Sequence, residues 1–500
     1  MTIALQLGLA LPPPGSRHVR RALHDQLRAA ILDGRLAPGQ ALPPSRTLAQ
    51  DLGLSRTTVV TVYDLLLSEG YVVARTGAGT FVADTGSKAQ AGAVAGAPPP
   101  GPPSGVRLNP ALLAPGGART PTPPPDVAVN FRLGLPDTSG FPFDIWGRLY
   151  IRALRAFART QPGYREPAGR SALRSAVAGH VSFTRAVACR AEDIIITAGA
   201  QQAFDLLARV LVTPDRAVVA MEDPGYASAQ GAFLAAGARL HPVPVDGEGL
   251  VVDALPPDAA VVYVTPSHQF PLGVPLSPRR RQALLAYAAV RGAVIVEDDY
   301  DGEFRYGGRP LDALQTLDGG ARVFYVGTFS KSLFPALRLG FIAVPAWARD
   351  HVLRAKQVAD WHAPVVEQDA LAAFMAEGHL ARHVRRMRAV YDGRRTALLG
   401  ALAAHCGGLL DPVPAVAGLH LATRFRRPVD ADAVVARALA AGIGVESLAN
   451  YALRPTPGGP VSGDGLAGLA FGYGGVGVDA IAPAVSRLAA ILRDAARSAG

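Results

Sequence analysis

The sequence predicts two folded parts of different class: a small, mainly helical module with a β-hairpin wing, and a larger α/β domain with a mostly parallel sheet. Three observations support this prediction. Apolar residues recur every four positions near the start of the chain; short strand patterns alternate with helical patterns beyond residue 190; and a proline-rich stretch separates the two regions. With 500 residues, 49% of them apolar, the chain can form several domains with large cores.

The composition indicates a protein of the reducing cytoplasm. The net charge of +10 permits a nucleic-acid or anionic partner but is weak support by itself. The only two cysteines, Cys189 and Cys406, lie far apart, so we expect no disulfide framework and no metal-ligand cluster. Residues 1–14 are apolar but lack the basic start of a signal peptide, and no run of about 18 uncharged apolar residues follows. We therefore predict neither export nor membrane insertion.

Residues 16–83 predict a three-helix module. The first helix ends at Asp33-Gly34, and its apolar stripe consists of Val19, Leu23, Leu27 and Ile31. A short second helix spans 46–51, with Ser45 as its expected N-cap and Gly53 as its end. The third helix starts at Leu54-Ser55 and presents one apolar face, made of Val59, Val62, Tyr63, Leu66 and Leu67.

The second and third helices have the pattern of a helix-turn-helix. They are joined by a tight turn that contains glycine, and the third opens with the exposed side chains of Arg56, Thr57 and Thr58. Residues 70–82 then alternate strand, glycine-rich tip and strand, which indicates a β-wing. By periodicity alone, a structural three-helix scaffold with an ordinary hairpin is an equally good interpretation.

Residues 84–126 are predicted to be a linker. This segment contains eleven prolines in 43 residues and is otherwise rich in Ala, Gly, Ser and Thr, so it cannot bury a core. The remaining chain, 127–500, is expected to hold a large α/β domain over about 160–390 and a small domain from about 391. Its entry segment, Asn130 to Asp137, is interpreted as an extended arm that packs on the main domain.

Five buried strands are predicted in the larger domain, and polar residues follow each of them. The strands span 193–197, 217–221, 260–265, 293–296 and 323–326. Ligands of open α/β sheets bind beyond the carboxyl ends of the strands, so these polar clusters are expected to form one site. Four acidic residues follow the fourth strand and require compensation if buried: Glu297, Asp298, Asp299 and Asp301.

The chemistry expected at this site centres on Lys331, which follows the last strand. A lysine amine in this position can form a Schiff base with an aldehyde cofactor. Phosphate donors are expected from the hydroxyls of Thr328 and Ser330, from Arg338, and from the backbone N–H groups of Ala200 and Gln201 at a strand-to-helix turn. If the aldehyde cofactor contains a pyridine ring, a carboxylate would keep the ring nitrogen protonated so that the ring can withdraw electrons. Asp298 is the first choice for this carboxylate and Asp299 the alternative. Tyr300 would donate to the phenolic oxygen of the cofactor's ring. Tyr226 would stack on or flank that ring, or it is an ordinary core tyrosine.

Two sets of motifs resemble known families. Leu-Pro-Pro-Ser-Arg-Thr-Leu-Ala, Leu-Gly-Leu-Ser-Arg-Thr-Thr-Val and Gly-Ala-Gly-Thr-Phe-Val resemble the winged helix-turn-helix of the GntR family. Thr-Phe-Ser-Lys-Ser-Leu-Phe-Pro-Ala-Leu-Arg-Leu-Gly resembles the pyridoxal-phosphate lysine motif of the aspartate-aminotransferase superfamily, fold type I. Together with Thr-Pro-Ser-His-Gln-Phe-Pro-Leu-Gly and Glu-Asp-Asp-Tyr-Asp-Gly-Glu-Phe-Arg-Tyr, their order along the chain is similar to the MocR/GabR subfamily of transcriptional regulators.

This resemblance implies a regulator that binds pyridoxal 5'-phosphate as an internal aldimine at Lys331 and senses an amine, an amino acid or the cofactor itself. It further implies a head-to-tail homodimer on a double-stranded DNA operator with two half-sites. The implied DNA-binding residues are Arg46, Ser55, Arg56, Thr57 and Thr58, with Gly77 and Gly79 letting the wing enter the minor groove.

Two departures from catalytic aminotransferases favour a sensor over an enzyme. Phe270 stands where those enzymes usually have an asparagine that bonds the phenolic oxygen, and no arginine for a substrate carboxylate occurs between Pro455 and Ser486. Arg454 is a candidate replacement for that arginine. The alternative functions are a working aminotransferase with an accessory DNA-binding domain and a degenerate domain that serves only to dimerise.

Overall fold

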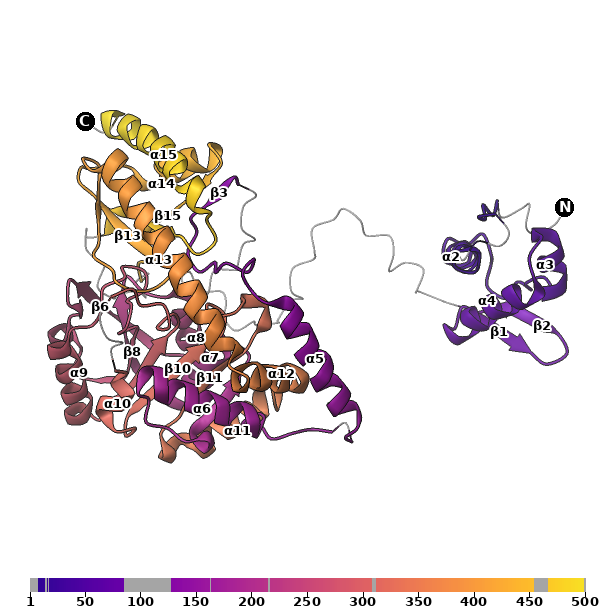
Figure 1. Ribbon diagram of the computed structural model, residues 1–500. Coiled ribbons are helices and arrows are strands. Elements are labelled where there is room, and N and C mark those ends of the chain that lie inside the picture. Colours follow the sequence, from indigo (N-terminus) through magenta and orange to yellow (C-terminus); the bar gives the residue numbers. More distant parts are fainter. Residues whose placement is uncertain are drawn as a thin grey trace. The chain divides into compact units, whose positions relative to one another are not determined.

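The computed structural model describes residues 8–13, 16, 18–84, 127–161, 163–214, 216–307, 312–453 and 466–498. The chain divides into two compact units, Met1–Arg107 and Leu108–Gly500 (Figure 1). Within the described residues, none of the helices combines the length and the apolar composition needed to cross a membrane.

The first unit contains the three helices and the β-hairpin that the periodicity predicts, arranged as a winged helix-turn-helix. Its elements are α2 (Val19–Leu32), α3 (Ser45–Leu52), α4 (Arg56–Ser68), β1 (Val72–Arg75) and β2 (Gly79–Val82). Antiparallel pairing of β1 with β2 aligns Val72 with Val82 and forms the wing. The apolar stripes of α2 and α4 meet in one core that includes Leu23, Leu27, Ile31, Val59, Val62 and Leu66.

One helix cap differs from the prediction. Ser45 is the first helical residue of α3, and the cap position is occupied by Pro44, without a side-chain cap bond. Proline fits there because its fixed φ and missing N–H cost nothing at a helix start. Ser55 does cap α4, since its hydroxyl accepts a hydrogen bond from the Thr58 backbone N–H at 3.1 Å.

The second unit is built on an eight-stranded mixed sheet with the order β4-β11-β10-β9-β8-β5-β6-β7. The neighbours from β10 through β6 are parallel, whereas β11 and β7 run antiparallel to their partners. The strands are β4 (Ile194–Thr197), β5 (Val218–Asp223), β6 (Arg239–Asp246), β7 (Gly249–Leu250), β8 (Ala259–Val264), β9 (Val294–Asp299), β10 (Val323–Thr328) and β11 (Gly340–Ala343).

Helices cover both faces of this sheet. Apolar residues of α7 and α8 pack in one cluster that contains Tyr263, while Val262 and Val264 of the same strand pack with α9 and α10 in another. This alternation follows from the period of two along a strand. The helices of this unit before the C-terminal part are α5 (Phe143–Ala158), α6 (Ser171–Arg185), α7 (Ala200–Leu211), α8 (Ala227–Ala235), α9 (Pro278–Arg291), α10 (Leu314–Asp318), α11 (Arg349–Asp360) and α12 (Val365–Ala376).

The C-terminal part adds a smaller sheet, in the order β12-β13-β16-β15. Its strands are β12 (Leu410–Pro412), β13 (His420–Phe425), β15 (Glu446–Ser447) and β16 (Gly468–Gly472), and its helices are α13 (His379–Cys406), α14 (Ala431–Ala440) and α15 (Val478–Ser498). Residue 391, the expected start of the small domain, lies inside the continuous helix α13. The entry arm joins this part, because β3 (Val129–Asn130) pairs with β14 (Ile443–Gly444).

The strands run further than predicted. Strand β5 extends to Asp223, β9 to Asp299 and β10 to Thr328, so several polar residues expected beyond the strands are their last members. Buried partners make this possible, since each carboxylate at these ends accepts hydrogen bonds inside the protein. Glu297, for example, accepts from the backbone N–H groups of Leu314 and Gln315 at 2.9 and 3.0 Å.

Candidate functional site

Lys331 lies directly after β10 with its side chain half-buried. Its ammonium nitrogen Nζ donates a hydrogen bond to the backbone carbonyl of Gly134 at 2.7 Å. Burial lowers the pKa of Lys331 from its usual value, although the carboxylates of Asp301 and Asp298 oppose that shift. A lysine with a lowered pKa is more often neutral and therefore a better nucleophile.

Asp298 at the end of β9 is buried and has one free oxygen. Its Oδ2 accepts a hydrogen bond from the Tyr263 hydroxyl at 2.6 Å, whereas Oδ1 has no partner among the residues that the structure describes. Burial raises the pKa of Asp298 to about 7, and the neighbouring charges of Asp299 and Asp301 act in the same direction. The free oxygen can accept a hydrogen bond from a protonated ring nitrogen.

Asp299 belongs to the opposite face of the sheet. Its Oδ2 accepts from Arg185 Nε at 2.6 Å and from the Tyr325 hydroxyl at 2.6 Å, and Arg185 also bonds Ser267. The two neighbours separate because successive side chains of a strand point to opposite faces. The expectation that the acids after β9 all belong to one site was wrong for Asp299 and Glu297, which bond groups away from Lys331.

Several of the predicted phosphate donors lie at or near the start of α7. Gly199 caps this helix with a φ of 77° and without a side-chain cap bond, so the first N–H groups remain available. Arg338 approaches the same turn and donates to the Ala198 carbonyl at 2.9 Å. The hydroxyls of Thr328 and Ser330 lie 3.1 Å apart on the Lys331 loop. Helix N–H groups, a guanidinium and two hydroxyls are suitable donors for a phosphate.

Aromatic rings surround Phe270. The ring centroids of Tyr226, Tyr300 and Tyr451 lie 5.4, 5.8 and 5.1 Å from that of Phe270, all in edge-to-face geometry. The hydroxyl of Tyr300 donates to the backbone carbonyl of His268 at 2.9 Å. Phe270 offers no hydrogen bond, so it cannot replace the asparagine that its position would hold in a catalytic aminotransferase.

Several contributors to this region were not found from the sequence. Gly134 was assigned only to a packing arm, and Tyr263 was counted as part of a buried strand. His268 and His420 come from β8's following loop and from β13, which are far apart in the chain. A hydroxyl in the middle of an apolar strand is the one signal that pointed to Tyr263. Arg454, the expected carboxylate ligand, lies outside the described residues.

The expected DNA-contacting residues lie at helix starts and at the wing tip. Arg46 and Arg56 are exposed on the first turns of α3 and α4. Ser55 and Thr58 bond each other, with 2.8 Å between their hydroxyl oxygens, so they also hold the start of α4. Gly77 and Gly79 have φ values of 78° and 111°, a region that other residues rarely adopt.

Comparison with known proteins gives matches for both parts of the chain. Residues 20–82 match the family of bacterial regulatory proteins named gntR, and residues 150–451 match aminotransferase class I and II. A probable rhizopine catabolism regulatory protein, MocR, of Rhizobium meliloti is 37% identical over 467 residues, which cover 92% of this chain and 90% of that protein. The pyridoxine biosynthesis transcriptional regulator PdxR of Corynebacterium glutamicum is 32% identical over 445 residues, covering 89% of this chain and 91% of the relative.

A solved structure supports the same fold for the larger unit. The kynurenine aminotransferase of Pyrococcus horikoshii superposes with a TM-score of 0.67 at 27% identity, and the match covers 74% of this chain and 91% of that chain. The regulators thus match nearly the whole chain, whereas the aminotransferase matches its larger part.

Proposed function

This chain belongs to the MocR-type transcriptional regulators, in which a gntR helix-turn-helix domain is fused to an aminotransferase class I and II domain, and we propose that it binds pyridoxal phosphate at Lys331 to sense an amine or amino acid. The observation that carries the proposal is that Lys331 lies close enough to buried Asp298 for the aspartate's charge to act on its pKa, while Asp298 Oδ1 has no partner among the described residues. Binding of the signal molecule would then change the affinity of the helix-turn-helix domain for DNA.

The residues present fit each part of the cofactor. The first turn of α7, with Arg338, Thr328 and Ser330, would hold the phosphate. Asp298 Oδ1 would accept the hydrogen bond of the ring nitrogen. When bound, pyridoxal phosphate supplies an aldehyde that condenses with amines and a ring that withdraws electrons.

The protein's own groups would prepare this site in three ways. The Gly134 carbonyl holds Lys331 Nζ in place, and the lowered pKa of that lysine keeps more of the amine neutral. Tyr263 donates to Asp298 and so fixes the orientation of its free oxygen. Tyr226 and Phe270 would exclude water from the ring's surroundings, because their aromatic side chains pack edge to face.

A sensor is favoured over an aminotransferase by the environment of Tyr300. Phe270 stands where a second hydrogen-bond donor to the cofactor's phenolic oxygen would be expected. The Tyr300 hydroxyl, the other candidate donor, donates to the His268 carbonyl instead. A site with fewer donors stabilises the charge of a transition state less well. We infer that amines bind without efficient turnover. We further propose a cytoplasmic, head-to-tail homodimer that binds two operator half-sites, since one small module with few phosphate contacts binds DNA weakly.

Covalent attachment can be tested sharply because the chain contains only three lysines, Lys88, Lys331 and Lys356. Pyridoxal phosphate would be added to the purified protein, reduced with borohydride, and located by peptide mass spectrometry. We expect the cofactor mass on Lys331, loss of the visible absorption band in Lys331→Ala, and retention of the band in Lys356→Arg. The proposal is refuted if the adduct lies on another lysine or if Lys331→Ala keeps the band.

The regulatory half of the proposal needs a second measurement. A panel of amines and amino acids would be screened by the absorption band and by operator binding in parallel. A compound that shifts the band and changes DNA affinity in the wild type, but not in Lys331→Ala, supports a sensor. Sustained conversion of an amino donor and a keto acid, with no effect on DNA affinity, would instead support the aminotransferase alternative.

A further inference from the structure

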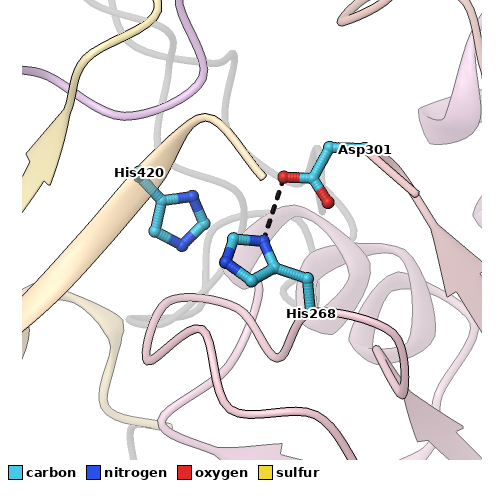
Figure 2. A group of neighbouring side chains, drawn as sticks. All are labelled: His268, Asp301 and His420. Carbon is cyan, nitrogen blue, oxygen red and sulfur yellow. Dashed lines mark hydrogen bonds and ion pairs between the residues drawn. The ribbon is translucent and has the colours of Figure 1, made fainter. Parts of the chain in front are cut away.

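Two histidines and an aspartate meet in the larger unit (Figure 2), and both histidine rings lie near Tyr300 of the candidate site. His268, Asp301 and His420 are all buried, and one ligand atom from each lies within 4.8 Å of the others. They come from the loop after β8, the segment after β9 and the start of β13. Three buried groups of this kind, drawn from distant parts of the chain, are the usual material of a transition-metal site.

The hydrogen bonds of the two rings define which nitrogen is free. His268 Nδ1 lies 3.0 Å from Asp301 Oδ2. The Tyr300 hydroxyl oxygen also lies 3.0 Å from His268 Nδ1, but its hydrogen is donated to the His268 carbonyl. Since an ionised carboxylate can only accept, Nδ1 carries the hydrogen and donates to Asp301. The Pro271 carbonyl, which can only accept, acts on the His420 ring, and His420 Nε2 has no partner among the described residues, so Nδ1 is assigned the hydrogen there as well. Nε2 of each ring is therefore unprotonated, and its lone pair is available to bind a ligand.

Neither lone pair has a partner within the described residues. The Nε2 atoms of His268 and His420 are both buried without a hydrogen bond. The ring centroids are 4.6 Å apart, and Figure 2 shows His420 on the side of His268 that faces away from Asp301. Buried polar atoms in folded proteins nearly always have a partner, and an exception often marks an ion or a water.

Close packing holds the His268 ring in this orientation. A Cβ atom at Gly418 would lie 2.0 Å from His268 Cε1, and one at Gly273 would lie 3.0 Å from Nε2. Only glycine leaves room for the imidazole at these two positions. A ring that cannot turn is suited to metal binding, because the ligand geometry exists before the ion arrives.

We propose that His268 and His420 bind a divalent transition-metal ion, represented by Zn²⁺, through their Nε2 atoms, and that Asp301 orients His268 from the opposite side. Histidine ligands characteristically donate their other ring N–H to a carboxylate or a backbone carbonyl. Here His268 does the first, toward Asp301, and the Pro271 carbonyl is the candidate acceptor for His420. The remaining coordination positions would take water or a small ligand, and the site does not depend on pyridoxal phosphate.

Metal titration of the full-length protein tests the proposal. A chain without an affinity tag would be stripped of metal and titrated with Zn²⁺ by calorimetry, with and without pyridoxal phosphate. We expect one ion per chain, at least tenfold weaker binding in His268→Ala and His420→Ala, and roughly 10–100-fold weaker binding in Asp301→Asn. His405→Ala, which alters an exposed histidine of α13, should bind as the wild type does.

The opposite results would overturn the assignment. The assignment is wrong if the wild type takes up no Zn²⁺, or if His420→Ala and His405→Ala bind Zn²⁺ with equal affinity. A water molecule or a proton shared between the two rings would then satisfy the Nε2 lone pairs. Wild-type crystals soaked in Zn²⁺ provide a measurement that needs no variant. An anomalous peak about 2.0–2.1 Å from each Nε2 is expected, and its absence would refute the site.

Discussion

Replacing each of two adjacent aspartates by asparagine should have opposite consequences. Both keep an Oδ1 without a partner among the described residues, but the charge of Asp298 acts on Lys331, whereas Asp299 Oδ2 accepts hydrogen bonds from Arg185 and Tyr325 on the other face. We expect Asp298→Asn to weaken pyridoxal-phosphate binding with little effect on folding. Asp299→Asn should destabilise the fold but leave the cofactor affinity of the folded protein nearly unchanged.

The magnitudes follow from the contacts. A hydrogen bond to a charged group contributes about 1.5–3 kcal/mol, so Asp298→Asn should raise the dissociation constant roughly 10- to 150-fold. Removing one partner of a buried ion pair costs about 3–5 kcal/mol, because the other charge stays buried. Asp299→Asn should therefore lower the free energy of unfolding by about that amount, since Arg185 is buried and its Nε lies 2.6 Å from Asp299 Oδ2.

Equilibrium dialysis of pyridoxal phosphate and denaturant unfolding would be measured on the wild type and on both variants. Affinity is compared only on protein that remains folded, as judged by circular dichroism. The reasoning fails if Asp299→Asn loses the cofactor while Asp298→Asn binds it normally, because the two carboxylates would then have exchanged roles.

Three further predictions concern pH, DNA and packing. Burial raises the pKa of Asp298 to about 7, so the affinity for pyridoxal phosphate should rise as the pH increases through 7 and the carboxylate ionises. The same dialysis should show no such pH-dependent rise for Asp298→Asn. Arg56→Ala should weaken operator binding by about 1–3 kcal/mol in fluorescence anisotropy, whereas Arg21→Ala on α2 should not; equal losses would contradict the recognition-helix assignment. Gly340→Ala should lower the melting temperature and cofactor affinity, because its Cβ would lie 2.9 Å from the Gly199 carbonyl carbon; Gly393→Ala in α13, with open space around it, should not.

The raised pKa of Asp298 also has a consequence for stability. The folded, cofactor-free protein binds more protons than the unfolded chain between the ordinary value near 4 and the folded value of about 7. Asp298 by itself therefore destabilises the cofactor-free protein as the pH rises through that window. Unfolding of the wild type and of Asp298→Asn at several pH values would isolate this contribution, and parallel curves for the two would contradict it.

Local patterns predicted the helix-turn-helix well. The apolar stripe from Val19 to Ile31 and the face from Val59 to Leu66 meet in one core, because residues four apart lie on one side of a helix. The predicted strands exist too, but their ends were misplaced. From the sequence, carboxylates such as Glu297 were predicted to lie in loops. In the structure Glu297 is buried within a strand and accepts hydrogen bonds from backbone N–H groups.

The candidate site was predictable only where one short segment contains its chemistry. Lys331, Thr328, Ser330 and Arg338 lie within eleven residues of one another, so one short motif and its resemblance to a pyridoxal-phosphate lysine motif predict a phosphate and an amine there. His420 carries no such signal, because its partner His268 is distant in sequence and reaches it through the packing of β13 against the loop after β8.

The order of residues was sufficient to determine the two fold classes and to predict a cofactor lysine in the larger one. Both follow from the periodicity and composition of short stretches of sequence, which do not depend on contacts between distant segments. Which face Asp298 and Asp299 each occupy, and which lone pairs remain free at His268 and His420, depends on strand register and on contacts between distant segments. Only the tertiary structure determines these, since a shift of one residue in β9 would exchange the two carboxylates.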